Sequence, residues 1–128
     1  VMIEPGITPL SWPFYRFLHQ EPVDMSVDPL EDQPAAVAED PFLSNQAIPT
    51  LLFCRKRYRL QFAMRHPEFV FSEVKAFSLL AYPLSGGFKR WSLLPKNVAE
   101  PLLNAEAILS PLFGAILGFR LSIILERA

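Results

Sequence analysis

The segment that most restricts the fold of this chain lies near its end, at residues 119–127. It reads Phe-Arg-Leu-Ser-Ile-Ile-Leu-Glu-Arg, and its middle is apolar at both odd and even positions. This pattern predicts a β-strand that is buried on both faces, as in sheets that carry helices on each side. The remaining segments predict too few strands to complete such a sheet. We therefore expect residues 1–128 to form a single, incomplete α/β domain.

The rest of the chain predicts an alternation of strands and helices. Apolar and polar residues alternate over 69–77, which indicates a strand. Apolar residues recur at helical spacing after Thr8 and again before Pro67, a pattern that is typical of helices. The expected elements are a strand at 1–4, a helix at 9–19, a helix capped at Thr50 and ending near 66, the strand at 69–77, an extended segment at 79–82, a helix at 98–117 and the strand at 119–127.

Two segments interrupt this alternation. Residues 21–41 are rich in proline and in acidic residues and have no periodicity, so we expect a long surface loop. Residues 88–118 separate the last two strands, so we expect a helical insertion there, with Pro111 as a kink and Gly118 as the helix end. The chain also begins within an apolar strand, which suggests that it is the C-terminal piece of a longer protein.

Composition and motif content exclude several classes of protein. The chain is 51% apolar and 20% charged, with one cysteine and two histidines. A disordered chain, a disulfide framework and a cysteine-histidine zinc site are thereby excluded, and we expect no metal. The five glycines form neither a dinucleotide-binding motif nor a P-loop. We expect no transmembrane span and see no signal peptide, so the default location is cytoplasmic.

The net charge of −1 divides unevenly along the chain. Residues 1–50 carry eight acidic residues and one basic residue, whereas residues 51–128 carry five acidic and eleven basic residues. The densest basic run, at 55–59, would suit nucleic acid, but helical spacing spreads its charges around the helix axis. We therefore expect a solvated helix face and no nucleic-acid partner.

Two side chains are candidates for chemistry. His19 ends a helix that follows the carboxyl end of a strand, the edge at which open α/β sheets bind ligands, and it could act there as a general base. The alternative is a histidine stabilised by the negative end of the helix dipole, and the sequence does not decide between the two. For Cys54, burial in an apolar core is favoured over a role as nucleophile.

Several segments together resemble the S-adenosylmethionine-dependent methyltransferases with a Rossmann-like fold. Residues 1–5, Val-Met-Ile-Glu-Pro, are similar to the end of the fifth strand in that family. Residues 80–88, Leu-Ala-Tyr-Pro-Leu-Ser-Gly-Gly-Phe, resemble the C-terminal section of bacterial members, as do Leu-Ser-Pro-Leu at 109–112 and the closing strand. The resemblance implies the C-terminal part of a seven-stranded sheet with helical insertions, in which 119–127 runs antiparallel between 1–4 and 69–77.

The same resemblance implies a function. The chain would be the C-terminal, substrate-side portion of a methyltransferase that acts on a small molecule or a lipid. S-adenosylmethionine is the implied cofactor, but the glycine-rich loop that holds it in the family is not in this sequence, so we assign no cofactor-binding residue and expect the chain alone to be inactive. His19 is the expected base. The residues expected to shape the substrate site are Glu4, Tyr15, Asn45 and Tyr82, with Gly86 and Gly87 as the hinge of a lid.

A second interpretation is a non-enzymatic α/β module that docks on a partner, or makes peripheral contact with a membrane surface, through its amphipathic helix at 98–117. That helix lacks the Lys and Arg residues that helices at membrane surfaces usually carry. An upstream reading frame that encodes a strand followed by Gly-x-Gly-x-Gly would favour the enzyme.

Overall fold

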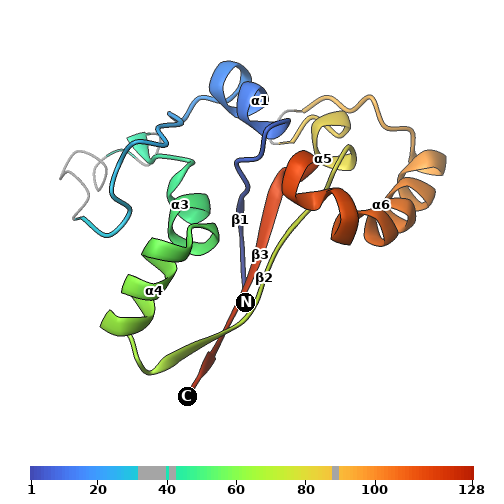
Figure 1. Ribbon diagram of the computed structural model, residues 1–128. Coiled ribbons are helices and arrows are strands. Elements are labelled where there is room, and N and C mark those ends of the chain that lie inside the picture. The colour runs from blue at the N-terminus through green and yellow to red at the C-terminus, as the bar shows by residue number, and fades with distance from the viewer. Residues whose placement is uncertain (32–39, 41–42, 88–89) are drawn as a thin grey trace.

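The computed structural model describes residues 1–31, 40, 43–87 and 90–128. Parts of the expected loop at 21–41 and of the expected insertion at 88–118 lie outside these residues. The described part is a mixed α/β fold of three strands and five helices (Figure 1). In chain order the elements are β1 (Met2–Pro5), α1 (Ser11–Leu18), α3 (Ile48–Cys54), α4 (Lys56–Arg65), β2 (Phe69–Phe77), α5 (Ala81–Leu84), α6 (Lys96–Leu117) and β3 (Arg120–Arg127).

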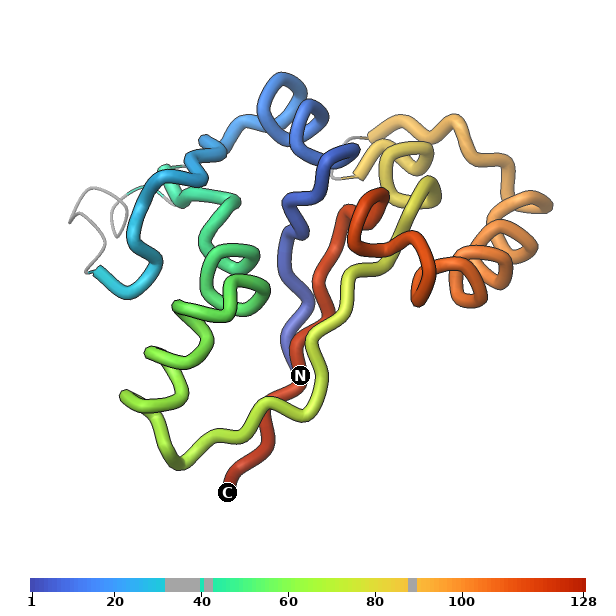
Figure 2. Tube along the Cα trace, viewed as in Figure 1, coloured from blue at the N-terminus to red at the C-terminus, as the bar shows by residue number. Residues whose placement is uncertain are grey.

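The sheet has the order β1-β3-β2, with β3 antiparallel to both neighbours. Pro5 of β1 and Phe77 of β2 both lie opposite Arg120, so β1 and β2 run parallel and end at the same edge of the sheet. Figure 2 shows the three strands side by side along their length. The expected central position of the last strand is therefore confirmed. The described residues form a sheet of three strands with antiparallel pairing, and the expected seven-stranded sheet is not seen.

The apolar core lies where α3 packs on the sheet. Phe53 of α3 contacts Leu121 and Ile123 of β3, and Met2 of β1 packs against this cluster. In β3, Leu121, Ser122 and Ile123 are all buried, whereas the last two residues of the strand are exposed. The expected burial on both faces therefore holds for the first half of β3.

α6 packs against β2 through a glycine. A Cβ atom on Gly114 would lie 2.2 Å from the carbonyl oxygen of Ala76, so only glycine lets the helix approach the strand this closely. In Figure 1, α3 and α4 lie beside β1, whereas α6 lies beyond β2. Among the described residues, no helix has the length and apolar character needed to cross a membrane.

The prediction for residues 79–82 is wrong. β2 ends at Phe77, Ser78 adopts a positive φ of 59°, and the chain then forms the short helix α5 instead of an extended segment. The reason is a contact distant in sequence: the carboxylate of Glu106 accepts hydrogen bonds from the backbone N–H groups of Leu80 and Ala81. These bonds satisfy two donors at the start of the helix.

The predicted helix from Thr50 to about residue 66 begins earlier, at Ile48, and is interrupted. Thr50 lies inside α3, and its hydroxyl accepts from the N–H of Ile7 instead of capping the helix. Arg55 has extended backbone angles, φ −86° and ψ 116°, and divides the segment into α3 and α4. α3 buries Leu51 and Phe53, whereas none of the residues of α4 is fully buried. The break lets α3 face the sheet while the basic residues at 55–59 remain exposed, as expected of a solvated helix face.

Candidate functional site

A cluster of aromatic rings lies at the sheet edge where β1 and β2 end. Tyr15 of α1, Tyr82 of α5 and Phe119 just before β3 have ring centroids 6.0–6.4 Å apart, and Phe14 also packs against Phe119 at 5.2 Å. α1 and α5 lie together at the end of the sheet that is opposite the two termini (Figure 1). This is the edge at which open α/β sheets bind ligands.

Tyr15 fixes the centre of this cluster. Its side chain is fully buried, and its hydroxyl donates a hydrogen bond of 2.7 Å to the carbonyl oxygen of Phe119. Burial raises the pKa of Tyr15 well above 10, and the neighbouring Tyr82 raises it further, while the charge of Arg120 acts in the opposite direction. Tyr15 is therefore a neutral hydrogen-bond donor that holds α1 on the sheet.

Tyr82 contacts both a cation and a glycine loop. The guanidinium of Arg120 is 5.4 Å from the centre of its ring, a cation–π arrangement. A Cβ on Gly87 would lie 3.0 Å from a ring carbon and from the hydroxyl oxygen. The Gly87 N–H also donates to the carbonyl oxygen of Tyr82 at 3.1 Å.

The two glycines of this loop both need their conformational freedom. Gly86 has φ +82° and Gly87 has φ +56°, a region that other residues rarely adopt. A Cβ on Gly86 would meet the carbonyl oxygen of Trp91 at 2.1 Å. Glycine therefore lets the turn after α5 close tightly on both Tyr82 and Trp91.

His19 joins the cluster at the end of α1. Its ring lies 5.6 Å from that of Tyr15, and its Nδ1 accepts a long hydrogen bond of 3.4 Å from the backbone N–H of Glu21. In a neutral imidazole this contact leaves the proton on Nε2. His19 itself is the extended residue that follows the last helical residue of α1. The structure thus brings His19, Tyr15, Tyr82 and the glycine pair to one edge.

The other two predicted residues, Glu4 and Asn45, make no ring contact with this cluster, although Glu4 is only one residue before the end of β1. Glu4 lies in β1 opposite Leu121, on the face where Met2 packs on the core. Asn45 holds the loop near the acidic segment: its side-chain oxygen accepts from the N–H of Asp24 at 2.9 Å, and its amide donates back to the Asp24 carbonyl at 2.7 Å. The geometry therefore connects Asn45 to loop structure rather than to the rings.

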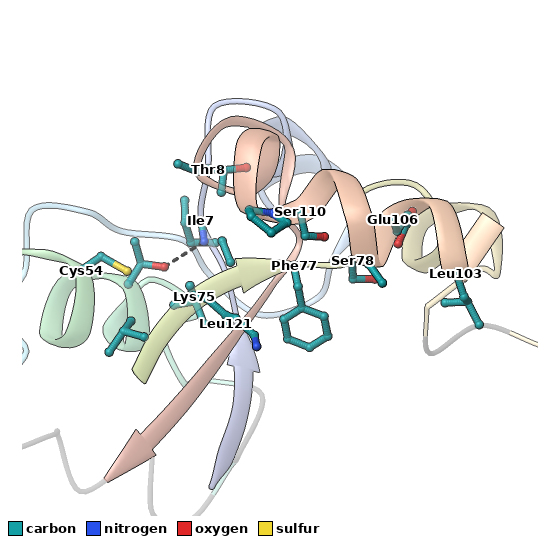
Figure 3. Close-up of a pocket in the computed structure, with 16 residues that line it drawn as sticks. Ile7, Thr8, Cys54, Lys75, Phe77, Ser78, Leu103, Glu106, Ser110 and Leu121 are labelled. Carbon is teal, nitrogen blue, oxygen red and sulfur yellow. Dashed lines mark hydrogen bonds between the residues drawn. The ribbon is translucent and has the colours of Figure 1, made fainter. Parts of the chain in front are cut away.

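A cavity of about 740 Å³ lies between α3, β2 and α6 (Figure 3). Its walls are mostly apolar, and one of them is held by a hydrogen bond of 2.8 Å from the N–H of Ile7 to the hydroxyl of Thr50. Figure 3 shows Cys54 at the α3 side, with Glu106 and Ser110 on α6. None of the residues predicted for the site lines this cavity.

Glu106 is the polar residue of this region that sequence reasoning missed. It is 5% exposed, and its Oε1 accepts from the N–H of Ala81 at 2.6 Å as well as from that of Leu80. The sequence signal was the position of Glu106 between two alanines in a largely apolar helix. A carboxylate is seldom buried without partners, so an acidic residue at such a position indicates a polar contact.

Cys54 corrects a second expectation. It does not belong to the buried core: the cysteine is exposed at the end of α3 and lines the cavity. Its immediate surroundings nevertheless raise the pKa of the thiol, because they reduce its contact with water, while Arg59 and Arg55 act in the opposite direction. A thiol with a raised pKa is a poor nucleophile near neutral pH.

The glycine-rich loop that holds the implied cofactor in the family is not in this sequence. The glycine that follows β1, Gly6, lies against the backbone of Arg120, where a Cβ would approach to 3.1 Å, so it serves strand packing. Within the part of the chain that the structure describes, no group of three or more His, Cys, Asp or Glu side chains could hold a metal ion.

A scan against protein-family models, a search of curated proteins and a search of solved structures each found no match for this chain. The functional interpretation therefore depends on the geometry of the site and on the sequence resemblance.

Proposed function

We propose that the chain is the C-terminal, substrate-side portion of an S-adenosylmethionine-dependent methyltransferase that acts on a small molecule or a lipid. The observation that carries the proposal is the strand order. β3 lies antiparallel between the parallel strands β1 and β2. This is the arrangement of the last three strands that the resemblance implies, and it is not a consequence of any single motif.

The position of the polar residues also supports this function. His19, Tyr15 and Tyr82 lie at the edge where β1 and β2 end. In the proposed role, His19 takes the proton of the acceptor group on Nδ1, in place of the 3.4 Å hydrogen bond that this atom accepts from the N–H of Glu21. Tyr15 and Tyr82 form an aromatic wall, and the loop at Gly86 and Gly87 closes beside it.

The methyl donor would be bound by a part of the protein outside this chain. The glycine-rich loop that holds this cofactor in the family is not in this sequence. The chain's own contribution is to bind and orient the acceptor and to accept its proton.

The test uses the full-length protein encoded by the source gene. S-adenosylmethionine binding is measured by titration calorimetry, and methyl transfer is measured with radiolabelled cofactor on small-molecule and lipid fractions. We expect binding and transfer by the full-length protein, and neither by residues 1–128 alone. A stop codon directly upstream of Val1, or a full-length protein that binds no cofactor, would refute the proposal.

One observation favours a second function, an interaction module. α6 exposes large apolar side chains, among them Ile108 and Leu112, which are 75% and 74% exposed. An exposed apolar patch of this kind usually marks an interaction site. A full-length protein that binds a partner through α6 but binds no S-adenosylmethionine would favour this alternative.

A further inference from the structure

The outward side of α6 is apolar along the whole helix. We call this side the outer face of α6 and define it by eight exposed residues that recur at helical spacing: Val98, Pro101, Ala105, Ile108, Leu109, Leu112, Phe113 and Ile116. None of them is charged, and none has a polar side chain. A helix on the surface of a domain ordinarily turns such a side toward the core.

The opposite side of α6 faces the sheet and the cavity, and it carries small and polar residues together with Leu103. Gly114 lies against the backbone of Ala76, Glu106 is buried against α5, and Ala107 and Ser110 line the cavity. The contact with β2 therefore uses the small and polar side of the helix. The large apolar side is directed away from the only sheet that the described residues form.

The outer face has the size of a protein interface. The six large residues of this face are exposed by between 40%, for Leu109, and 75%, for Ile108. With about 200 Å² for a large apolar residue, they present roughly 600 Å², close to the roughly 800 Å² that each partner buries in a standard interface.

The position of α6 decides which molecule can cover this face. β3 is paired on both sides, which leaves β1 and β2 as the two edge strands, and in the proposed function further strands join the sheet at the free edge of β1. This step rests on the proposed function, in which the rest of the protein extends that edge. Figure 1 places α6 beyond β2, on the side away from β1. The rest of the same chain would therefore leave the outer face open.

Charge decides between the two remaining molecules that could cover the outer face, a membrane and a second copy of the chain. A helix that lies on an anionic membrane carries several Lys or Arg residues, whereas α6 has one cationic residue, Lys96, at its first position. A two-fold axis across an uncharged apolar face brings no like charges together, so a second copy can pack there without repulsion. We infer that the outer face of α6 binds the same face of a second copy, as an antiparallel helix pair that forms a homodimer.

Sedimentation velocity of the full-length protein over a range of concentrations tests this inference. We expect a dimer whose dissociation constant rises at least 100-fold in Leu112→Glu. The matched control is Met64→Glu, which places the same charge on an equally exposed residue of α4 and is expected to leave the dimer intact. Circular dichroism checks that both variants fold. A wild-type monomer throughout, or a dimer insensitive to Leu112→Glu, would overturn the inference.

Cross-linking gives a second measurement that does not need a disruptive substitution. In a Cys54→Ser background, Ala105→Cys places a thiol near the middle of the outer face, where an antiparallel pair brings it close to its copy. We expect rapid formation of a disulfide-linked dimer under mild oxidation, and none for Met64→Cys. Equal rates for the two variants would contradict the helix pair.

Two further readouts separate the other outcomes. The first is flotation with vesicles of phosphatidylcholine and phosphatidylglycerol. If the protein is monomeric in solution, floats with these vesicles and no longer floats as Leu112→Glu, the outer face binds a membrane, and the dimer is overturned. S-adenosylmethionine binding is measured on the same samples. Cofactor binding by a monomer would refute only the dimer, whereas a dimer that binds no cofactor would refute only the proposed function.

Discussion

The hydroxyl of Tyr15 donates a hydrogen bond to the carbonyl oxygen of Phe119, 104 residues later in the chain. The same carbonyl accepts a second hydrogen bond, of 2.9 Å, from the N–H of Gly6. The end of β1, helix α1 and the start of β3 are thus joined at one oxygen atom. This oxygen fixes the edge at which His19 and Tyr82 lie, so the geometry of the candidate site depends on it.

Tyr15→Phe removes one of these two hydrogen bonds and is expected to lower the free energy of unfolding by about 1 kcal/mol at neutral pH, because Gly6 still pairs with the carbonyl. Because the pKa of Tyr15 is raised in the folded state, its contribution to stability is complete below the ordinary tyrosine pKa of 10.0 and declines as pH rises above it. Thermal unfolding from pH 8 to 11.5 should show the difference between wild type and variant shrinking above pH 10. A constant difference would mean that Tyr15 titrates normally.

His19→Ala in the full-length protein tests the proposed base. We expect kcat to fall by about 10²–10⁴-fold, with S-adenosylmethionine affinity and the melting temperature nearly unchanged, since the hydrogen bond that His19 Nδ1 accepts from the N–H of Glu21 is long, at 3.4 Å. The control is His66→Ala, at the end of α4, where Nδ1 lies 3.5 Å from Glu68; its rate should remain that of the wild type. An unchanged rate in His19→Ala would remove this residue from the site, and equal losses of rate and stability would favour the helix-dipole interpretation.

Features that depend on neighbouring residues were predictable from the sequence. The bounds of β2 match the predicted strand at 69–77, although a bulge between Phe71 and Glu73 breaks the predicted alternation, so that Phe71 and Val74 both pack on the core. The apolar run at 119–127 correctly indicated a central strand. Helix α6 also occupies nearly the expected range. In each case the local pattern is strong enough to select the element without help from distant contacts.

Features that depend on distant contacts were not predictable. α5 forms because Glu106, 25 residues after Ala81, accepts its N–H, and no local signal between 79 and 82 shows this. The break at Arg55 follows from the packing of α3 on the sheet. For the site, the order of elements correctly suggested that Tyr15, His19 and Tyr82 would meet at one edge, whereas Asn45 is engaged by Asp24 within a loop.

Gly87→Ala should destabilise the loop that closes on Tyr82. An alanine at φ +56° costs about 1–2 kcal/mol, and its Cβ would also press on the tyrosine ring at 3.0 Å. Gly87→Asn is the informative companion, since asparagine tolerates positive φ but still carries a Cβ. Urea unfolding of both variants separates the two causes: a milder loss in Gly87→Asn indicates backbone strain, and equal losses indicate the contact with Tyr82. Wild-type stability in both would contradict the described turn.

Glu106→Ala should be among the most damaging substitutions in the chain. It leaves the buried N–H of Ala81 and the partly buried N–H of Leu80 without their acceptor, for an expected loss of about 2–4 kcal/mol. Glu106→Gln keeps a carbonyl oxygen at the same place and should lose less. Glu100→Ala, an exposed acidic residue on the same helix, should remain within about 0.5 kcal/mol of wild type. Denaturant unfolding measures all three, and equal stability of Glu106→Ala and Glu100→Ala would show that the carboxylate does not hold α5.

Residues 1–128 expressed alone should be marginally stable and prone to association. Ile3 is 48% exposed in β1, whose free edge has no strand partner among the described residues, and the outer face of α6 adds a second apolar surface. We expect the isolated chain to bind a dye specific for apolar surface and to unfold over a broad transition, whereas the full-length protein should bind less dye and unfold more sharply, because it covers β1. Leu112→Glu in the isolated chain should reduce dye binding only in part, since the β1 edge stays open. A monodisperse chain with one sharp transition and no dye binding would contradict the expectation that β1 needs a neighbour.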